Sequence, residues 1–175
     1  MTILLMGHPN VGKSAVFNRL TGANITESNY PGTTVDFTEG YAFIEGDEYK
    51  IIDVPGTFST DPKDEAEKVA LDILAEHEDA IVVVVIDSTK VERGLYLAFE
   101  VMERGYRVAI ALNMWDDAEK HNLKIDVERL EEILGVPVVP TVAISGKGIS
   151  SLVEKIPDAS RVDIKELKGK FGSST

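Results

Sequence analysis

Cysteine is absent from the 175 residues of the chain. This absence excludes a disulfide framework, cysteine-ligated zinc or iron–sulfur clusters and a thiol nucleophile, and it fits a reducing compartment such as the cytoplasm. Positive charge is scarce too, because 18 Lys and Arg stand against 30 Asp and Glu, a net charge of −12. Such a surface repels the phosphates of nucleic acids and anionic lipids, so we do not expect a general nucleic-acid-binding protein.

Long hydrophobic runs are also lacking. The longest, residues 80–86, has seven residues, whereas a helix that crosses a bilayer needs about 20. No basic segment precedes the first apolar run as it would in a signal peptide. His8, His77 and His121 show no metal-ligand spacing, so we expect them to be solvated or packed. With 43% hydrophobic and 27% charged residues, the composition is typical of one globular domain.

Apolar, β-branched runs alternate with amphipathic stretches along the chain. Strands are expected at residues 3–6, 81–86 and 108–112, and helices at 14–20 and 95–102. This alternation predicts parallel strands joined by helical crossovers. The Val- and Ile-rich run at 81–86 is typical of a central strand with helices on both faces. The predicted fold class is therefore α/β, with a doubly wound, mostly parallel sheet.

Local signals add one hairpin and two helices to this prediction. The runs 37–44 and 48–52 predict an antiparallel hairpin, so one edge strand should run against the rest. Asp61-Pro62 predicts a helix start, and Asp126 and Gly135 bound a helix over 127–134. The last residues have little apolar periodicity and end in Gly-Ser-Ser-Thr. We expect one domain over residues 1–158 and a linker or disordered tail over 159–175.

The segment GHPNVGKS at residues 7–14 matches the pattern GxxxxGK[ST]. It follows an expected strand and opens an expected helix, so its backbone N–H groups can surround a phosphate at the helix N-terminus. Gly7 and Gly12 permit the tight path of such a loop, Lys13 can reach the β- and γ-phosphates, and the hydroxyl of Ser14 can bind Mg²⁺. The alternative is a glycine-rich turn without a ligand. The residues expected to contact the nucleotide here are Gly7, His8, Pro9, Asn10, Val11, Gly12, Lys13, Ser14 and Ala15.

The segment DVPG, residues 53–56, follows the second strand of the expected hairpin. Asp53, at a strand end, can hold Mg²⁺ through water, and the N–H of Gly56 can meet the γ-phosphate. Val54 and Pro55 are expected beside the nucleotide. Taken alone, the segment is equally typical of a turn.

The segment NMWD, residues 113–116, ends the strand expected at 108–112. The carboxylate of Asp116 can accept two N–H groups from the edge of a guanine ring, and adenine offers no matching pair, so the segment favours GTP over ATP. As a lone tetrapeptide it is more typical of a helix cap. Its place after the other two motifs favours guanine recognition by Asn113, Met114 and Asp116.

The order of these motifs, with a threonine-bearing loop between the first and the second, resembles the Ras-like GTPases. Four longer segments resemble the N-terminal GTPase domain of ferrous iron transport protein B, the prokaryotic Fe(II) transporter, and the resemblance covers residues 1–155. Met114, where most GTPases carry Lys, is among its more specific marks. The resemblance implies a Ras-like P-loop GTPase fold that binds GTP or GDP with Mg²⁺. The four segments are SNYPGTTVD at 28–36, DVPGTFS at 53–59, VIDSTKVERGLYL at 85–97 and ALNMWDDAEKHNLKID at 111–126.

The resemblance also implies roles for single residues. Thr34 matches the switch I threonine that completes Mg²⁺ coordination, with Thr33 as the neighbouring candidate. Asn10 matches the loop asparagine that helps to bind K⁺ beside the phosphates; the alternative is an asparagine that stabilises the turn. Thr57 stands where Ras-like proteins carry the glutamine that positions water, so we expect slow hydrolysis. The expected catalytic residues are Asn10, Lys13, Thr34 and Gly56.

The loop that caps the guanine departs from the family pattern. It usually reads Ser-Ala in relatives, whereas this chain has Val142-Ala143 at that place. The N–H of Ala143 is expected to meet the guanine O6, with Ser145 as the rival. This departure predicts a modest affinity for the base.

Relatives continue into a helical domain and a membrane-embedded permease, neither of which is found in these residues. The resemblance therefore implies a domain at the cytoplasmic face of the cell membrane. Its partner would be the iron permease portion of the parent chain, and any oligomer is expected to form through that parent protein.

Loss of the γ-phosphate is expected to release segments 24–38 and 54–65. Two alternatives remain: a nucleotide sensor with negligible hydrolysis, and an RNA- or ribosome-associated GTPase, which the net charge of −12 and Met114 disfavour.

Overall fold

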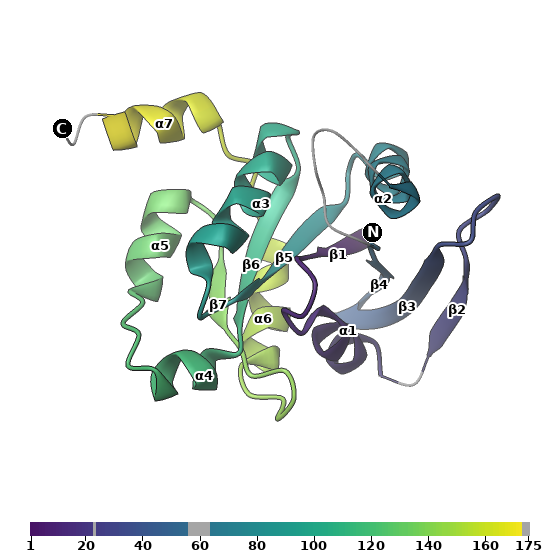
Figure 1. Ribbon diagram of the computed structural model, residues 1–175, viewed down its shortest axis with the longest axis horizontal. Coiled ribbons are helices and arrows are strands. Elements are labelled where there is room, and N and C mark those ends of the chain that lie inside the picture. Colours follow the sequence, from purple (N-terminus) through teal and green to yellow (C-terminus); the bar gives the residue numbers. More distant parts are fainter. Residues whose placement is uncertain (23, 56–63, 173–175) are drawn as a thin grey trace.

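The computed structural model describes residues 1–22, 24–55 and 64–172, and these residues form one seven-stranded sheet flanked by helices (Figure 1). The strands lie in the order β2-β3-β4-β1-β5-β6-β7. Their bounds are β1 (Thr2–Met6), β2 (Ile25–Asn29), β3 (Asp36–Ile44), β4 (Asp47–Asp53), β5 (Ile81–Asp87), β6 (Arg107–Asn113) and β7 (Val138–Pro140). The helices are α1 (Lys13–Thr21), α2 (Glu65–Glu76), α3 (Val91–Glu103), α4 (Trp115–Lys120), α5 (Val127–Leu134), α6 (Ile149–Lys155) and α7 (Ile164–Gly172), with a short 3-10 helix η1 (Ile156–Asp158) after α6.

The sheet is mostly parallel, as the sequence predicts. Strands β4, β1, β5, β6 and β7 pair in parallel, and β3 runs antiparallel to both of its neighbours. The hairpin of β3 and β4 is confirmed, but its antiparallel strand does not lie at the edge. That position belongs to β2, whose sequence ITESN is mostly exposed and has no apolar alternation that could have predicted a strand.

Different helices cover the two faces of the sheet. Along β1, Ile3 and Leu5 point to the face of α1 and α6, and Leu4 and Met6 point to the face of α2 and α3, because side chains alternate along a strand. Residues 81–86 of β5 are buried throughout. Each fully buried Val, Ile or Leu contributes about 1.5–3 kcal/mol through the hydrophobic effect. The predicted doubly wound α/β architecture is therefore confirmed.

Two helix starts are set by aspartate caps. The side chain of Asp126 accepts a hydrogen bond of 3.0 Å from the N–H of Arg129, and α5 ends at Gly135 with φ 70°, as predicted. The cap of α2 is Asp64, which accepts a bond of 2.8 Å from the N–H of Glu67. The start predicted at Asp61-Pro62 lies outside the described residues.

Part of the segment expected to be a linker or disordered tail, 159–175, is ordered. Ser160 pairs with Val108 in a β-bridge and residues 164–172 form α7, while residues 173–175 lie outside the described part of the chain. Leu167 of α7 is 4% exposed and joins the apolar cluster on the α3 face (Figure 1). One buried leucine in a charged segment leaves too weak a periodicity to predict this helix. None of the described helices is both long enough and apolar enough to cross a membrane.

Candidate functional site

Four segments meet at one end of the sheet, where β1, β4, β6 and β7 end. They are the loop 7–12, the segment that begins at Val54, residues 114–116 and the loop 141–148, and they contact one another through Lys13 and Asn113. The helices that follow β1 and β4 lie on opposite faces of the sheet. In open α/β sheets, the carboxyl ends of the strands at such a switch point are the usual ligand site.

The loop 7–12 follows a path that only glycine permits at two positions. At Gly7 a Cβ atom would lie 2.8 Å from the carbonyl oxygen of Val85. At Gly12, where φ is 86°, a Cβ atom would overlap Nδ2 of Asn113. Asn10 also has a positive φ, 67°. Helix α1 begins directly after Gly12, so the free N–H groups of its first turn face the loop, which is the geometry that an anion requires.

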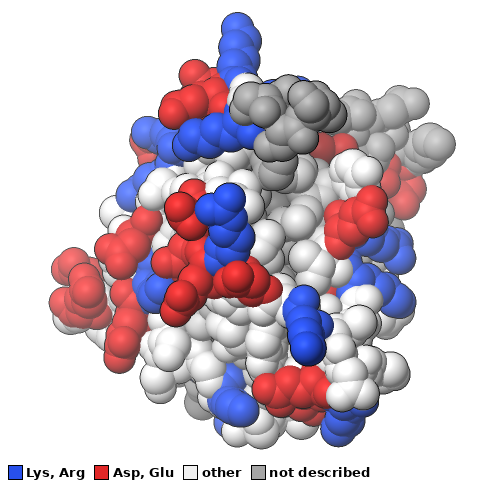
Figure 2. Space-filling view, turned by 90° about the vertical axis from the view of Figure 1, so that its left-hand side faces the viewer, with Lys and Arg blue, Asp and Glu red and all other residues white. Residues whose placement is uncertain are grey.

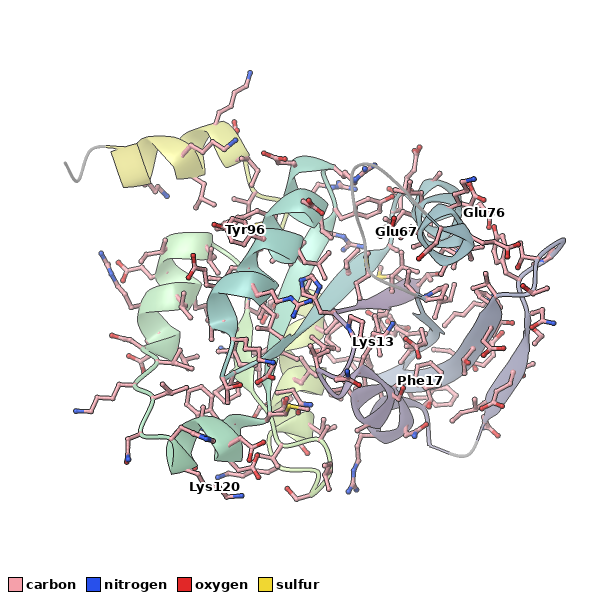
Figure 3. All side chains as sticks on the ribbon, in the orientation of Figure 1. Lys13, Phe17, Glu67, Glu76, Tyr96 and Lys120 are labelled. Atoms are coloured by element: carbon pink, nitrogen blue, oxygen red, sulfur yellow. The ribbon has the colours of Figure 1, made fainter. Side chains whose placement is uncertain are left out.

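Lys13 and Asp53 are brought together beside this loop. Lys13 extends from the first turn of α1 toward β4 (Figure 3), and its Nζ lies 2.9 Å from Oδ1 of Asp53 and donates to the carbonyl of Val54. Both side chains are mostly buried, 15% and 19% exposed. Oδ1 of Asp53 is a buried atom that accepts no hydrogen bond from the residues that the structure describes, so the ion pair is its contact there. An ammonium and a carboxylate thus share one place next to the loop.

Asn113 ties the site together from the end of β6. It is 3% exposed, and its Nδ2 donates a hydrogen bond of 3.0 Å to the carbonyl of Val11. Its Oδ1 accepts bonds from the hydroxyl of Thr141 at 3.1 Å and from the N–H of Ala143 at 3.0 Å. The side chain therefore connects the loop 7–12 with the loop 141–148. Thr141, buried and bonded to Asn113, is a site residue that sequence reasoning missed.

Met114 and Asp116 begin helix α4. Met114 has a left-handed φ of 56° and is the N-cap. The carboxylate of Asp116 is 45% exposed and lies 3.8 Å from Nζ of Lys120, one turn further along α4. Figure 3 shows Lys120 on the outer side of this helix. Such an exposed pair is worth about 0–1 kcal/mol. The carboxylate is therefore free to take hydrogen-bond donors of a ligand.

In the loop 141–148, the groups expected to meet the guanine O6 are bonded within the protein. The N–H of Ala143 is already bonded to Asn113. The hydroxyl of Ser145 donates to the carbonyl of Val142 at 3.1 Å, and its N–H bonds to the same carbonyl at 3.1 Å. By contrast, the N–H of Ile144 makes no hydrogen bond with any residue in the described part of the chain. In this loop it is therefore the N–H of Ile144 that is free among the described residues, and no side-chain signal in the sequence indicates this.

The family model of ferrous iron transport protein B matches residues 1–156. The chain belongs to this family. It is 40% identical to the Fe(2+) transporter FeoB of Helicobacter pylori over 145 residues, which make up 83% of this chain and 23% of that protein. It is 38% identical to an Fe(2+) transport protein A/FeoB fusion protein of Porphyromonas gingivalis, over 98% of this chain and 21% of that protein. The chain therefore spans about a fifth of the length of these curated relatives.

Solved FeoB structures have the same fold. The cytosolic domain of T. maritima FeoB in its GMPPNP form superposes with a TM-score of 0.85 at 38% identity, covering 93% of this chain and 67% of that one. The isolated G domain of T. maritima FeoB gives a TM-score of 0.83 at 39% identity, covering 90% of this chain and 97% of that one. The chain thus has the fold of the FeoB G domain, a Ras-like P-loop GTPase fold.

The threonines of the expected FeoB switch I have separate contacts. The hydroxyl of Thr33 donates to the carbonyl of Tyr30 at 2.9 Å and accepts from the N–H of Val35 at 3.1 Å, so it stabilises the turn between β2 and β3. The hydroxyl of Thr34 is exposed and donates to Oε2 of Glu65 on α2 at 3.3 Å. The structure therefore places Thr34 against α2 rather than at the loop 7–12. Gly56 and Thr57 lie outside the described residues.

The ring of His8 contacts α3. Its Nε2 lies 3.2 Å from the carbonyl of Arg93, and its Nδ1 is buried without a hydrogen bond to the described residues. Burial lowers the pKa of His8, which the bond to the Arg93 carbonyl only partly offsets. The lowered pKa favours the neutral ring, and the contact with the Arg93 carbonyl is a hydrogen bond when the proton is on Nε2. No group of three or more His, Asp and Glu side chains in the described ranges forms a cluster that could hold a metal ion.

Proposed function

We propose that this chain is the GTP-binding and GTP-hydrolysing regulatory domain of a prokaryotic ferrous iron transporter, and that it changes conformation through switch I and switch II. The observation that carries the proposal is the meeting of Lys13 and Asp53, 2.9 Å apart, beside a glycine loop that Asn113 ties to the base-recognition segments. Membership of the FeoB family supports it, as do the GMPPNP and GDP forms in which T. maritima FeoB was solved.

In this proposal the triphosphate lies along the start of α1. The N–H groups of residues 10–14 surround the β-phosphate, and Lys13 binds β- and γ-phosphate oxygens. Ser14, Thr34 and Asp53 offer the oxygen ligands that Mg²⁺ prefers, and the buried Oδ1 of Asp53 suits that cation. Bound there, Mg²⁺ would neutralise charge at the β- and γ-phosphates.

The base is read at the ends of β6 and β7. The exposed carboxylate of Asp116 accepts the ring N–H and the amino group of guanine. Asn113 holds the surrounding segments in place through its three bonds. Because the N–H of Ala143 is paired, we assign the contact with the guanine O6 to the N–H of Ile144. This combination selects guanine over adenine, which carries an amino group at position 6 and no ring N–H.

Hydrolysis is an in-line attack of water on the γ-phosphorus, in which the bond to the β,γ-bridging oxygen breaks and GDP and phosphate are formed. The residue after Gly56 is Thr57, so no glutamine follows the DVPG segment to position the water, and we expect slow turnover. The side chain of Asn10 makes no hydrogen bond with the described residues, which leaves its oxygen available to K⁺ beside the phosphates. A monovalent cation there would neutralise developing charge in place of an arginine finger.

The switch would operate between the β2–β3 turn and α2. In this structure Thr34 bonds to Glu65 at 3.3 Å, and the hydroxyl of Tyr30 donates to Glu76 at 2.7 Å, so the turn is tied to α2 at two points. For Thr34 to bind Mg²⁺, its bond to Glu65 has to break. Binding of GTP would then rearrange residues 24–38 and 54–65, and loss of the γ-phosphate would allow the bonds to α2 to re-form.

Phosphate release from Mg·GTP in K⁺ and in Na⁺ tests this proposal. We expect slow release that K⁺ accelerates, and Asn10→Ala is expected to remove the acceleration while GDP binding persists. Asn122→Ala is the matched control, because Asn122 is also a left-handed asparagine, φ 54°, but lies in the turn after α4. Release in neither salt would favour a nucleotide sensor without hydrolysis, and equal release in both would remove K⁺ from the proposal.

The parent protein and an RNA-bound role are separate questions. We propose that the domain lies at the cytoplasmic face of the cell membrane, that its partner is the membrane-embedded iron permease of the parent chain, and that any oligomer forms through that parent.

A ribosome- or RNA-associated GTPase is the less favoured candidate. On the face shown in Figure 2, the Lys and Arg side chains lie among Asp and Glu and form no continuous basic surface in the described residues. RNA binding that weakens steeply with salt would support the RNA role instead.

A further inference from the structure

Arg19 connects helix α1 with the loop 141–148. It lies in the last turn of α1, and its Nε donates a hydrogen bond of 2.8 Å to the carbonyl of Ala143. Its Nη2 donates to the next carbonyl along the chain, that of Ile144. One planar guanidinium therefore holds two successive carbonyls, a contact that fixes orientation as well as distance.

This contact determines the direction of one amide. The carbonyl of Ala143 and the N–H of Ile144 belong to the same peptide group, and in a trans peptide they point in opposite directions. Because Arg19 holds the carbonyl, the N–H of Ile144 faces away from the guanidinium. The preceding peptide is fixed as well, since Asn113 accepts the N–H of Ala143 at 3.0 Å.

The returning side of the loop closes around the guanidinium. Val142 and Lys147 pair in a β-bridge, with a hydrogen bond of 2.9 Å from the N–H of Val142. Gly146 lies between them with φ 84°, and a Cβ atom there would be 3.3 Å from Nη1 of Arg19. The loop is thus bonded within itself, and Arg19 and Asn113 hold it from outside at Ala143.

We propose that Arg19 is a positioning residue for guanine recognition. It holds the loop 141–148 so that the N–H of Ile144 is presented to the guanine O6, and it thereby sets how long the nucleotide stays bound. The inference rests on the proposed function, because it requires a guanine nucleotide at this site. Arg19 acts through the loop backbone and makes no contact with the nucleotide.

The first test is the rate at which GDP leaves the protein. Arg19→Met keeps the apolar stem but removes both hydrogen bonds, and we expect ribose-labelled GDP to dissociate roughly 5- to 20-fold faster. Arg19→Lys supplies one donor group without the planar fork, so its GDP release rate should lie between those of the wild type and Arg19→Met. Arg129→Met is the matched control, since Arg129 is an exposed arginine on α5 that pairs with Glu132 at 3.0 Å, and its release rate should equal that of the wild type.

The second test separates positioning from a general loosening of the fold. The diphosphate of 2-aminopurine riboside keeps the amino group of guanine but lacks both O6 and the ring N–H that Asp116 accepts. It should therefore bind more weakly than GDP to both proteins, and Arg19→Met should leave its affinity at the wild-type value. If Arg19→Met weakened the binding of this ligand and of GDP by the same factor, Arg19 would only stabilise the fold, and the proposal would be wrong. If the wild type binds GDP and Arg19→Met releases it at the wild-type rate, this inference alone is overturned. If the wild type binds no GDP, the proposed function fails first.

Discussion

Gly12 is the residue at which two parts of the site come closest. Its φ is 86°, and a Cβ atom would overlap Nδ2 of Asn113, which bonds to the carbonyl of Val11. Gly12→Ala is therefore expected to break that bond in addition to straining the backbone. We expect a loss of roughly 2–4 kcal/mol in the free energy of unfolding, measured by urea denaturation, together with the loss of GDP binding.

Gly105 provides the control for this substitution. Its φ is 85°, nearly that of Gly12, but a Cβ atom there would meet nothing within 4 Å. Gly105→Ala should cost about 1 kcal/mol from backbone strain alone and should leave GDP binding unchanged. Equal losses for the two variants would contradict the contact between Gly12 and Asn113 as the cause.

Asp116 is the residue that we expect to read the base. Asp116→Asn replaces one acceptor oxygen by an amino donor, so it should weaken GDP binding by roughly 10- to 100-fold, and calorimetry measures the change. The same variant should gain affinity for xanthosine diphosphate, whose position 2 carries an oxygen that accepts from the new amide. Asp117→Asn is the control, because Asp117 is a similarly exposed neighbour, 3.7 Å from Lys120. Unchanged GDP affinity in Asp116→Asn would refute the assignment.

Some residues of the site could be predicted from the sequence and others could not. Lys13, Asp53 and Asn113 could be predicted as site residues, because their charged or amide side chains carry the chemistry of their motifs. The pairing of Ala143 with Asn113 could not, because backbone N–H groups have the same chemistry at every position and only the folded loop decides which one is free. Ile144 is 82% exposed and apolar, and nothing in its side chain indicates a role.

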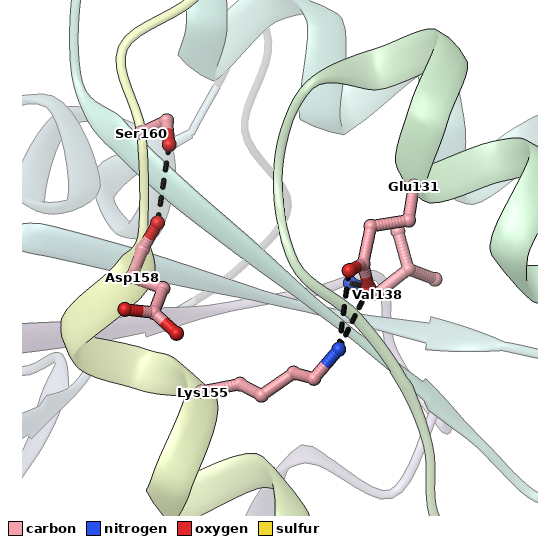
Figure 4. A network of polar contacts seen from close by, with 5 residues as sticks. All are labelled: Glu131, Val138, Lys155, Asp158 and Ser160. Carbon is pink, nitrogen blue, oxygen red and sulfur yellow. Dashed lines mark hydrogen bonds and ion pairs between the residues drawn. The ribbon is translucent and has the colours of Figure 1, made fainter.

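At the scale of elements, one carboxylate fastens α5 to β7 and α6. Figure 4 shows Glu131 of α5 accepting from the N–H of Val138 at 2.9 Å and from Nζ of Lys155 at 3.1 and 3.2 Å, and shows the separate bond of 3.1 Å from Ser160 to the carbonyl of Asp158. Burial by itself would raise the pKa of Glu131, but the Val138 hydrogen bond and the Lys155 ammonium outweigh it and lower the pKa.

A lowered pKa in the folded state makes the stability depend on pH. Glu131 stabilises the fold above the pKa of the unfolded chain, and this contribution is lost as the pH falls through the lower pKa of the folded protein. Glu131→Gln should therefore destabilise the protein by about 0.5–1 kcal/mol at pH 7, a small effect because water screens the partly exposed pair. Urea denaturation should show this difference from the wild type shrinking as the pH falls below the usual range for glutamate.

The neighbouring residue supplies the control for that titration. Glu132 pairs with Arg129 at 3.0 Å but is 72% exposed, so Glu132→Gln should change the unfolding free energy little at any pH. A difference between Glu131→Gln and the wild type that stays constant with pH would show that the charge of Glu131 is not what fastens α5.

Helices and strands with a clear apolar periodicity or a capping residue could be predicted from the sequence, and those without these signals could not. Helix α5 follows from Asp126, Gly135 and the apolar positions between them. Strand β2 has no such pattern, because its five residues lie at the sheet edge and are mostly exposed. Helix α7 buries Leu167 and packs Ile164 against the same apolar cluster, and these two positions are too few to give a periodicity that predicts a helix.

At the scale of the whole molecule, the order of the strands brings distant motifs together. The central position of β1 between β4 and β5 places the loop 7–12 beside Asp53, and the parallel pairing of β5, β6 and β7 brings Asn113 and Thr141 to the same end. The alternation of strands and helices was sufficient to predict this class of sheet. The place of β3 one strand in from the edge was not predictable, because it depends on β2.

The contact between Lys13 and Asp53 has a consequence for how the resting protein discriminates among ions. The ammonium of Lys13 and the carboxylate of Asp53 neutralise each other. An anion that bound Lys13 alone would leave Asp53 as an unpaired, mostly buried charge, and a divalent cation that bound Asp53 alone would leave Lys13 unpaired. A metal-chelated polyphosphate brings both charges in one encounter and leaves neither group uncompensated. If the proposed function holds, free phosphate and free Mg²⁺, both abundant in a cell, would each compete poorly for this site, and Mg·GTP would replace both partners of the ion pair at once.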